Sequence, residues 1–468
     1  MAKLARSEPR ATWGDVVRIR LAGELSLARD VWALAWPAIA HMSLVTLVFL
    51  VNRALVGRFS PTALASMQIS GTLVWMAYAV FTAFSAGTLA VVARSVGAGE
   101  RAAAARAARA SILFAFLVGL VVTVPILAAN GALLRALFPA AGAAVIEDAQ
   151  AYLHIVLPVL PLAFVEAIAA ASLQGAGDTR TPLYVALAGN LVNLTLSALL
   201  ISGTFGAPQL GVRGAAIGTT AAIAIEGTLL AAALLSSWSP LPLRAARGGL
   251  AEDMQALRRV LWVSIPTLLE KLVYHGGNLG YVAILGLLGA AAMAANQAMI
   301  SVEAICWLSA DGFGVAAAAM VAQKLGAGRS GEAARAGIYA TAMAVALLSA
   351  FGLVFALAPR LLMRPFSTDP AILALGSQSL RIAAIAQPFM AFAIVVSMSL
   401  RGAGATKTVL YITFVGGLCV RIAATWLFAV TLGWGLVGIW LGSTADWVIR
   451  SALLAMAYAQ GRWKTHSV

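Results

Sequence analysis

Six acidic side chains fall inside long apolar runs, where an ionisable group is costly to bury and usually has a function. They are Glu166, Glu226, Glu270, Glu303, Asp311 and Asp446. A carboxylate at membrane depth can accept a proton or bind Na⁺ through its oxygens. If an organic cation competes for the same negative charge, the site can exchange one cation for the other. These acids therefore indicate cation coupling or substrate binding, with a structural role as the alternative for each.

The segment IPTLLEKLVYHGGN carries Glu270, Lys271, Tyr274 and His275. On a helix, Tyr274 lies one turn from Glu270 and His275 one turn from Lys271, so each pair can share a face. Glu270 and Lys271 are adjacent and point about 100° apart. Glu270 is expected either to take part in coupling or substrate binding, or to pair with Lys271 or another cation between helices.

A second segment, SVEAICWLSADGFG, carries Glu303 and Asp311. They are eight residues apart, about 80° apart around a helix, so both can face one cavity. The alternatives are that Glu303 forms a structural bridge to Lys271 and that Asp311 lines an irregular stretch of helix before Gly312.

Asp446 is expected to be mainly structural, since Arg421 and Arg450 can pair with it. No CxxC pair or His/Cys cluster in the sequence indicates a metal. The sequence contains no GxxxxGK[ST] loop, which an ATP-driven pump would need to bind the nucleotide. Its four histidines do not form an enzyme motif. We therefore expect no cofactor and no enzyme activity, with H⁺ or Na⁺ as a coupling ion.

Composition places these residues in a membrane protein. The chain has 468 residues, of which 61% are hydrophobic and 11% charged, and its mean hydropathy is +0.91. A soluble domain has about 25% charged residues. Twelve apolar runs are long enough to cross a bilayer, which predicts an all-α polytopic fold. They lie at about 31–56, 62–92, 110–133, 150–173, 181–203, 213–237, 257–287, 292–322, 333–358, 370–400, 408–432 and 434–459.

The net charge of +14 indicates orientation rather than a nucleic-acid partner, because the basic residues lie between the apolar runs. With the N-terminus inside, about 22 Lys and Arg fall on the inner side and about six on the outer side. This bias predicts a multi-pass protein of the cell inner (plasma) membrane with both termini in the cytoplasm.

The sequence contains an internal repeat. SLQGAGDTRTPLYV (172–185) returns as SLRGAGATKTVLYI (399–412), and VARSVGAG (92–99) returns as VAQKLGAG (321–328). Each half holds six spans, so both enter the membrane in the same sense. This predicts two six-helix lobes related by a parallel repeat and arranged as a V. The expected parts are a cytoplasmic segment (1–30), an N-lobe (31–237), a cytoplasmic linker (238–256), a C-lobe (257–459) and a cytoplasmic tail (460–468).

The first repeated motif is expected to form matched hinges, with a direct gating contact as the alternative. Four glycines permit the left-handed backbone that ends a helix: Gly175, Gly177, Gly402 and Gly404. Thr179 and Thr406 can cap the following helix. Arg180 and Lys407 are expected to anchor at phosphate headgroups.

These motifs resemble those of the multidrug and toxic compound extrusion (MATE) family over about residues 30–460. The resemblance rests on PAIA (37–40), LVG (55–57), both GAG loops, and LQGAGDTRTP with its C-terminal echo. It is closest to the bacterial branch named for DNA-damage-inducible protein F. The resemblance implies a monomeric efflux antiporter in membrane lipid that exchanges small organic, often cationic, substrates for H⁺ or Na⁺. A lipid-linked oligosaccharide flippase of the same wider superfamily is the alternative.

The chain departs from the family at two acids. Members of this branch carry an Asp late in span one and another in span five, where this chain has Asn52 and Ser197. Both usual N-lobe proton sites are then neutral, although Asn190 and Asn193 leave a possible hydrogen-bonding pocket. The sodium-linked branch uses acids in spans seven, eight and ten, and span ten has none here. The remaining candidates are therefore concentrated in the C-lobe.

Overall fold

The computed structural model describes residues 13–139, 141–237, 239–246, 248–367 and 369–466, and within these ranges it contains helices and no strand. The first half holds α1 (Trp13–Phe59), α2 (Pro61–Gly97), α3 (Arg101–Leu137), α4 (Ala143–Val156), α5 (Leu160–Gly175), α6 (Arg180–Ser202) and α7 (Val212–Leu235). The second half holds α8 (Leu250–Gly286), α9 (Ala290–Gly326), α10 (Ser330–Leu357), α11 (Pro359–Met363), α12 (Pro370–Gly402), α13 (Thr406–Thr413), α14 (Arg421–Trp426) and α15 (Gly435–Gln460).

The helices form twelve spans, six in each half. Helices α4 and α5 make one span and α13 and α14 make another, while α11 is a short connecting helix. Among the described residues, nine segments are long and apolar enough to stand out as membrane spans, and α2, α8 and α15 complete the set. Helices α8 and α15 carry the charged residues Glu270, Lys271, Asp446 and Arg450.

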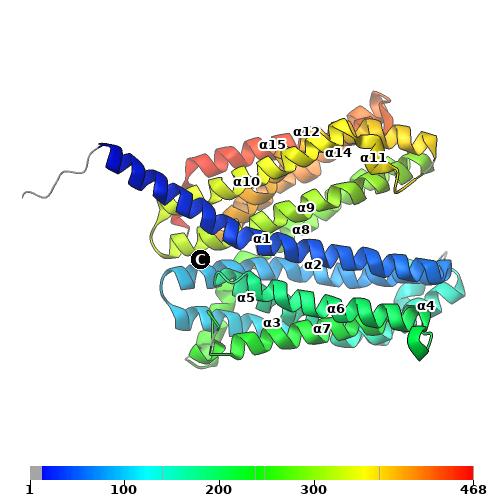
Figure 1. The fold of residues 1–468 in the computed structure, drawn as a ribbon, viewed down its shortest axis with the longest axis horizontal. Helices are drawn as coiled ribbons and strands as arrows, with labels where there is room; N and C mark the ends of the chain where they lie inside the picture. Colours follow the sequence, from blue (N-terminus) through cyan, green and yellow to red (C-terminus); the bar gives the residue numbers. More distant parts are fainter. Residues whose placement is uncertain (1–12, 140, 238, 247, 368, 467–468) are drawn as a thin grey trace, which may run out of the picture.

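The two lobes form a V (Figure 1). They lie closest together at the end where α1 begins and the C-terminus lies, and they diverge toward the other end. We call the closed end the GAG face, because it carries the loops Gly97–Gly99 and Gly326–Gly328. This arrangement agrees with the predicted two-lobe fold.

Helices α1 and α8 each belong to both lobes. The first half of α1 places Leu27, Val31 and Ala35 in the core that α9, α10 and α12 form. The first half of α8 places Val260 and Val263 in the core of α2, α3 and α5. The second half of each helix returns to its own lobe, where α1 packs on α6 and α8 on α13. The predicted lobe ranges 31–237 and 257–459 therefore describe the two halves of the chain. In space, each lobe also contains the first part of one helix from the other half.

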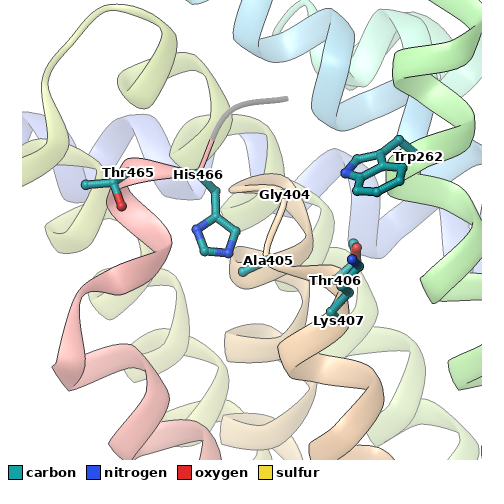
Figure 2. Close-up of a pocket in the computed structure, with 7 residues that line it drawn as sticks. All are labelled: Trp262, Gly404, Ala405, Thr406, Lys407, Thr465 and His466. Atoms are coloured by element: carbon teal, nitrogen blue, oxygen red, sulfur yellow. The ribbon is translucent and has the colours of Figure 1, made fainter.

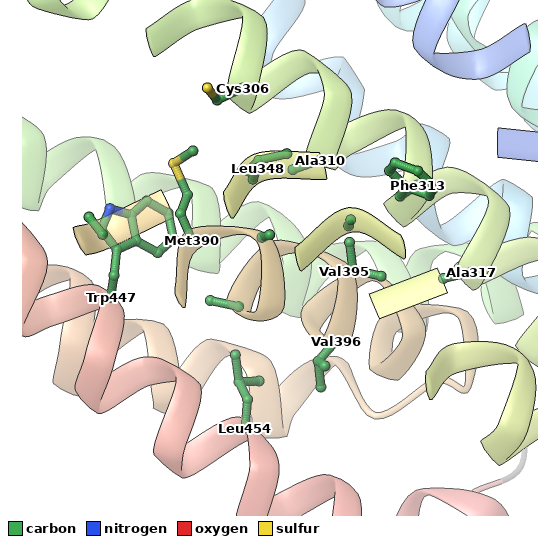
Figure 3. Packing of buried hydrophobic residues seen from close by; sticks show 14 of the residues in the cluster. Cys306, Ala310, Phe313, Ala317, Leu348, Met390, Val395, Val396, Trp447 and Leu454 are labelled. Carbon is green, nitrogen blue, oxygen red and sulfur yellow. The ribbon is translucent and has the colours of Figure 1, made fainter. Parts of the chain in front are cut away.

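The C-lobe core lies between α9, α10, α12 and α15 (Figure 3). Small residues of α9 pack there with Phe313, Met390 and Leu454, all at most 1% exposed. Small side chains let membrane helices approach closely, and larger ones fill the remaining space. Cys306 lies in the same core and is a free thiol.

Candidate functional site

Three neutral residues of the N-lobe converge on one hydrogen-bonded group. The side-chain amide of Asn52 on α1 donates to Oδ1 of Asn193 on α6 at 2.7 Å, and Ser197 Oγ donates to the same oxygen at 3.2 Å. All three side chains are buried, and Asn52 Oδ1 has no partner among the described residues. Asn190 instead donates to the backbone oxygen of Ala186. The sequence therefore identified a real cluster, which is polar but carries no charge.

Glu270 forms a bidentate ion pair with an arginine from another helix. Arg401 Nε and Nη2 lie 3.0 and 2.6 Å from the two carboxylate oxygens, and Thr413 Oγ1 donates to Oε1 at 3.1 Å. Glu270 is only 6% exposed. The structure thus shows the alternative predicted for Glu270, an ion pair between helices. Its partner is Arg401 and not Lys271. A guanidinium in this geometry holds the carboxylate firmly.

Lys271 and Asp311 lie near this ion pair without joining it. Both are half-buried, and Lys271 interacts electrostatically with Asp311, Glu270 and Arg401. In the part of the chain that the structure describes, neither makes an ion pair within 4.0 Å. Two acids and two bases are thus grouped here, and Asp311 is the acid that no guanidinium clamps.

Glu303 has a neutral partner. Gln387 Nε2 on α12 donates to Glu303 Oε1 at 2.9 Å and also to the backbone oxygen of Ala383 at 3.1 Å. Arg421 interacts with Glu303 electrostatically, but no ion pair joins them among the described residues. The alternative bridge from Glu303 to Lys271 is not among the ion pairs of the described residues. Glu303 is half-buried. Among the described residues, no lysine or arginine forms an ion pair with its carboxylate.

Asp446 lies between two arginines, as the sequence predicted. Arg421 Nε donates to Oδ2 at 2.9 Å, Arg450 Nε donates to Oδ1 at 2.8 Å, and Arg450 Nη2 also bonds to Oδ2. Asp446 is fully buried, and the guanidinium of Arg450 lies 4.1 Å from the ring centre of Trp447. Because hydrogen bonds link the three side chains and both guanidinium groups lie over the Trp447 ring, the triad can remain charged inside the lobe.

Tyr274 lies against this triad. Its ring centre is 5.4 Å from the Arg421 guanidinium and 5.7 Å from that of Arg450, and Trp307 packs on it at 6.1 Å. His275 is exposed and contacts the edge of the Tyr274 ring. Of the residues predicted on this helix, Tyr274 therefore joins the arginine–aspartate triad, whereas His275 points away from it.

Two further acids meet in the N-lobe. Glu166 on α5 and Glu226 on α7 interact electrostatically with each other and with Tyr78 on α2. Gly189 makes room for Glu226, since a Cβ there would lie 2.2 Å from its Oε1. No ion pair of the described residues includes either acid. The sequence identified both acids individually, but they lie on separate spans, and nothing in the pattern indicated that they meet.

The two halves of the repeat touch each other at the GAG face. A Cβ at Gly97 would lie 1.9 Å from the backbone oxygen of Gln323, and one at Gly326 would lie 2.0 Å from that of Arg94. The two contacts are equivalent, because Arg94 and Gly97 occupy the positions in VARSVGAG that Gln323 and Gly326 occupy in VAQKLGAG. Gln323 Nε2 also donates to the backbone oxygen of Gly175 at 2.8 Å. The lobes are therefore held together by glycines that allow their backbones to meet.

Replacing Gly326 with alanine is expected to open the GAG face. The new Cβ would overlap a backbone oxygen, which cannot rotate away, so the lobes must separate. We expect the ratio of open to closed molecules to rise roughly tenfold, as a change of about 1.4 kcal/mol would produce. Spin labels at the exposed positions 101 and 329 would report longer distances. Gly331→Ala is the matched control, because a Cβ there meets nothing within 4 Å, and an equal distribution in both variants would contradict the expectation.

The four hinge glycines divide into two kinds. Gly177 and Gly404 have φ of +92° and +86°, as predicted for residues that end a helix. Gly175 and Gly402 are instead the last residues of α5 and α12 and do not adopt left-handed backbone, so that part of the prediction was wrong. Their role is close packing: a Cβ at Gly175 would lie 2.9 Å from a backbone oxygen of α2, and one at Gly402 would lie 2.4 Å from one of α9.

The predicted threonine caps were also wrong. Thr179 precedes α6 but makes no capping hydrogen bond, and Thr406 is the first residue of α13, preceded by Ala405. Asp178 performs this function for α6, because its Oδ1 accepts the backbone N–H groups of residues 180 and 181 at 3.1 and 2.9 Å. A carboxylate is a stronger acceptor than a hydroxyl at a helix N-terminus, where the helix dipole favours negative charge.

A model of the MatE family matches residues 37–199 and again residues 266–427. The chain belongs to the MatE family. The two matches correspond to the two copies of the repeat. The probable multidrug resistance protein NorM of Thermotoga maritima is 29% identical over 444 residues, which cover 94% of each chain. The multidrug resistance protein MdtK of Pectobacterium atrosepticum is 27% identical over 429 residues, 89% of this chain and 92% of that one.

A solved structure shows the same fold. A mutant of the Vibrio cholerae MATE transporter VcmN superposes with a TM-score of 0.86 at 18% identity, covering 95% of this chain and 100% of that one. The MATE resemblance and the all-α, two-lobe fold of twelve spans are thereby confirmed. The protein is an integral membrane transporter and not an enzyme. The narrower relation to the DNA-damage-inducible branch stays a prediction.

Two residues in the C-lobe and one on α1 escaped the sequence analysis as candidates. Arg401 clamps Glu270, and Gln387 binds Glu303. His41 on α1 is 8% exposed, and its Nδ1 makes no hydrogen bond within the described chain. The repeat carried a usable signal for His41, because this residue and Glu270 occupy equivalent positions in the matches that begin at 37 and 266. No group of three His, Cys, Asp or Glu side chains in the described residues could hold a metal ion.

Proposed function

We propose that this MATE protein is a secondary multidrug exporter that exchanges small organic, often cationic, compounds for H⁺ or Na⁺ by alternating access. The relatives NorM and MdtK are named multidrug resistance proteins, which supports the substrate class. The coupling ion and the antiport mechanism are part of the proposal. Antiport of two cations requires a negatively charged group that each cation can occupy in turn, and the C-lobe contains acids that could serve as this group.

The observation that carries this proposal is the environment of Glu303. Glu270 and Asp446 are clamped by arginines at 2.6–3.0 Å, so a cation would have to break a charged pair to reach them. Among the described residues, the carboxylate of Glu303 accepts a hydrogen bond only from the neutral side-chain amide of Gln387, so a proton or Na⁺ can bind its other oxygen at lower cost. Asp311 is the second unclamped acid of the C-lobe and is the secondary candidate.

The N-lobe contributes hydrogen bonds rather than charge. The group of Asn52, Asn193 and Ser197 can orient a polar part of a substrate, and the unpartnered Asn52 Oδ1 is a free acceptor within the described structure. An amide does not gain or lose a proton near neutral pH, so this group does not couple transport to a pH gradient. We therefore assign coupling to the C-lobe and substrate orientation to the N-lobe.

We further infer that the GAG face is cytoplasmic. The helix ends and loops of this face carry Arg101, Arg106, Arg109, Lys324 and Arg329, and segments rich in basic residues stay in the cytoplasm. The state described here is then closed toward the cytoplasm. Because both halves of the repeat lie on one chain, we propose that a single chain is the transport unit in the plasma membrane, with lipid as its only other partner.

Transport in proteoliposomes tests this function. The purified wild-type protein would be reconstituted, and the movement of a fluorescent organic cation would be followed under an imposed pH gradient or an imposed Na⁺ gradient. We expect one gradient to drive the dye against its own gradient and dissipation of that gradient to abolish accumulation. Dye movement that ignores both gradients would contradict antiport and would favour the flippase alternative or an uncoupled carrier.

A further inference from the structure

The triad of Asp446, Arg421 and Arg450 contains one more positive charge than its carboxylate needs. Arg450 alone bonds to both oxygens of Asp446, because its Nε donates to Oδ1 at 2.8 Å and its Nη2 donates to Oδ2. The two residues lie four apart on α15, so this pair needs no other helix. Arg421 adds a second guanidinium from another span, with Nε and Nη2 both 2.9 Å from Oδ2. The triad therefore carries a net positive charge inside the C-lobe.

Arg421 belongs to a span whose backbone departs from a regular α-helix. The span begins with α13 at the GAG face, where Lys407 lies beside a hollow and near Trp262 of α8 (Figure 2). Further along, π-helical turns occupy Phe414–Val420 and Leu427–Thr431, and the short helix α14 between them begins at Arg421. Turns of this kind are rare and occur frequently at functional sites. The irregular backbone thus surrounds the residue that supplies the extra charge.

Glycines let this span approach α15 and α8 closely. A Cβ at Gly416 would lie 2.8 Å from Asp446 Oδ1, and a Cβ at Gly277 of α8 would lie 2.0 Å from the backbone oxygen of Gly417. Larger side chains at these positions would push the span away from both helices. The close approach places Arg421 against the triad and beside α8.

The carboxylate of Glu303 lies within electrostatic reach of this extra charge. The guanidinium of Arg421 is 6.0 Å from the ring centre of Tyr281 on α8, and the Tyr281 hydroxyl donates to Asn296 Oδ1 on α9 at 2.8 Å. Arg421 and Glu303 interact electrostatically with Tyr281 and with each other. Among the described residues, no ion pair within 4.0 Å joins Arg421 to Glu303. Arg421 therefore attracts the carboxylate without clamping it.

We propose that Arg421 sets how tightly Glu303 holds a cation. This inference rests on the proposed role of Glu303 as the group that substrate and coupling ion occupy in turn. The guanidinium is a fixed positive charge that repels a cation bound at Glu303, so each cation binds weakly enough to be released again. Asp446 holds Arg421 in position through the hydrogen bond to Oδ2. Arg421 thus acts through Glu303 and does not itself bind the substrate.

Removal of the charge in Arg421→Gln tests this role. We expect the purified variant to bind a fluorescent organic cation roughly tenfold more tightly than the wild type, because the bound cation is no longer repelled. Binding is measured in Na⁺-free alkaline buffer, where competition from Na⁺ and protons is weakest. In proteoliposomes, KM for the dye should fall and kcat should fall with it, because release becomes slower. A purely structural role would lower activity without tightening binding.

Two further variants show whether the effect belongs to the charge. Arg421→Lys keeps the positive charge and should bind the dye as the wild type does. Arg421→Met fills similar space without a charge and should bind as tightly as Arg421→Gln, and it replaces that variant if glutamine impairs folding. Asp446 stays paired with Arg450 in all three variants, and thermal unfolding in detergent reports their stability. Arg360→Gln, at an exposed position of α11, is the control for loss of an arginine elsewhere in the lobe and should leave binding unchanged.

Glu303→Gln separates failure of this inference from failure of the proposed function. If Glu303→Gln binds the dye weakly but neither neutral variant of Arg421 binds it more tightly than the wild type, only the role of Arg421 is wrong. The role is also wrong if Arg421→Lys or Arg360→Gln tightens binding as much as Arg421→Gln does, since the charge at this position would then not matter. If Glu303→Gln binds the dye as tightly as the wild type, the substrate does not use Glu303, and both proposals are wrong.

Discussion

Replacing Asp446 with asparagine is expected to lower the free energy of unfolding by roughly 3–5 kcal/mol. The substitution preserves the shape of the side chain but removes the negative charge that Arg421 and Arg450 share. Both guanidinium groups are nearly inaccessible, at 6% and 7% side-chain exposure, so two cations would remain buried without a counter-ion. Thermal unfolding of the purified protein in detergent measures the loss.

A partly exposed ion pair provides the matched comparison for this prediction. Lys324 and Glu332 lie 2.7 Å apart, with side chains 26% and 32% exposed. We expect Glu332→Gln to change stability by about 1 kcal/mol or less, because water replaces a lost surface partner. If Asp446→Asn proved as mild as Glu332→Gln, the triad would not be a buried charged unit that stabilises the C-lobe.

Replacing Glu303 with glutamine is expected to abolish gradient-driven transport while leaving the fold intact. Glutamine keeps the acceptor oxygen that Gln387 uses, so the helix contact between α9 and α12 survives. The variant cannot bind a proton or neutralise Na⁺, so we expect at least about a tenfold fall in the rate of dye uptake under the driving gradient, the effect of about 1.4 kcal/mol or more. Proteoliposome transport measures the rate, and dye equilibration without a gradient shows whether the carrier still moves.

Two other acids test whether the effect belongs to Glu303. Glu147→Gln removes an exposed acid near the start of α4 and should transport as the wild type does. Glu270→Gln breaks the clamp with Arg401 and should mainly lower thermal stability. Full coupling in Glu303→Gln, together with lost coupling and retained stability in Glu270→Gln, would move the coupling site from α9 to α8.

The sequence predicted the spans, the repeat and the family because these depend on patterns along the chain. Twelve apolar runs and two pairs of repeated motifs are visible without any contact being known. The Asp446–Arg450 pair was also predictable, since residues four apart share a helix face. The crossing of α1 and α8 between the lobes was not predictable, because both lobes present equally apolar surfaces to a helix.

The partners of Glu270 and Glu303 could not be deduced for a related reason. Arg401 is 131 residues from Glu270, and Gln387 is 84 from Glu303. Only the packing register of α12 against α8 and α9 brings these side chains together, and hydrophobic patterning does not specify that register. The misassigned glycines illustrate a second limit, since a glycine at a helix end fits both a left-handed cap and a close helix contact. Gly402 is of the second kind because α9 passes beside it.

In the proposed mechanism, substrate and coupling cation compete for the carboxylate of Glu303. The direct measurement is the release of H⁺ or Na⁺ when a fluorescent organic cation binds to purified wild-type protein in weakly buffered detergent solution. Because binding of two competing ligands is reciprocally linked, we predict release of about one cation for each substrate bound, and no release from Glu303→Gln. Substrate binding to the wild type without release of either ion, or with the same release from Glu303→Gln, would contradict this account.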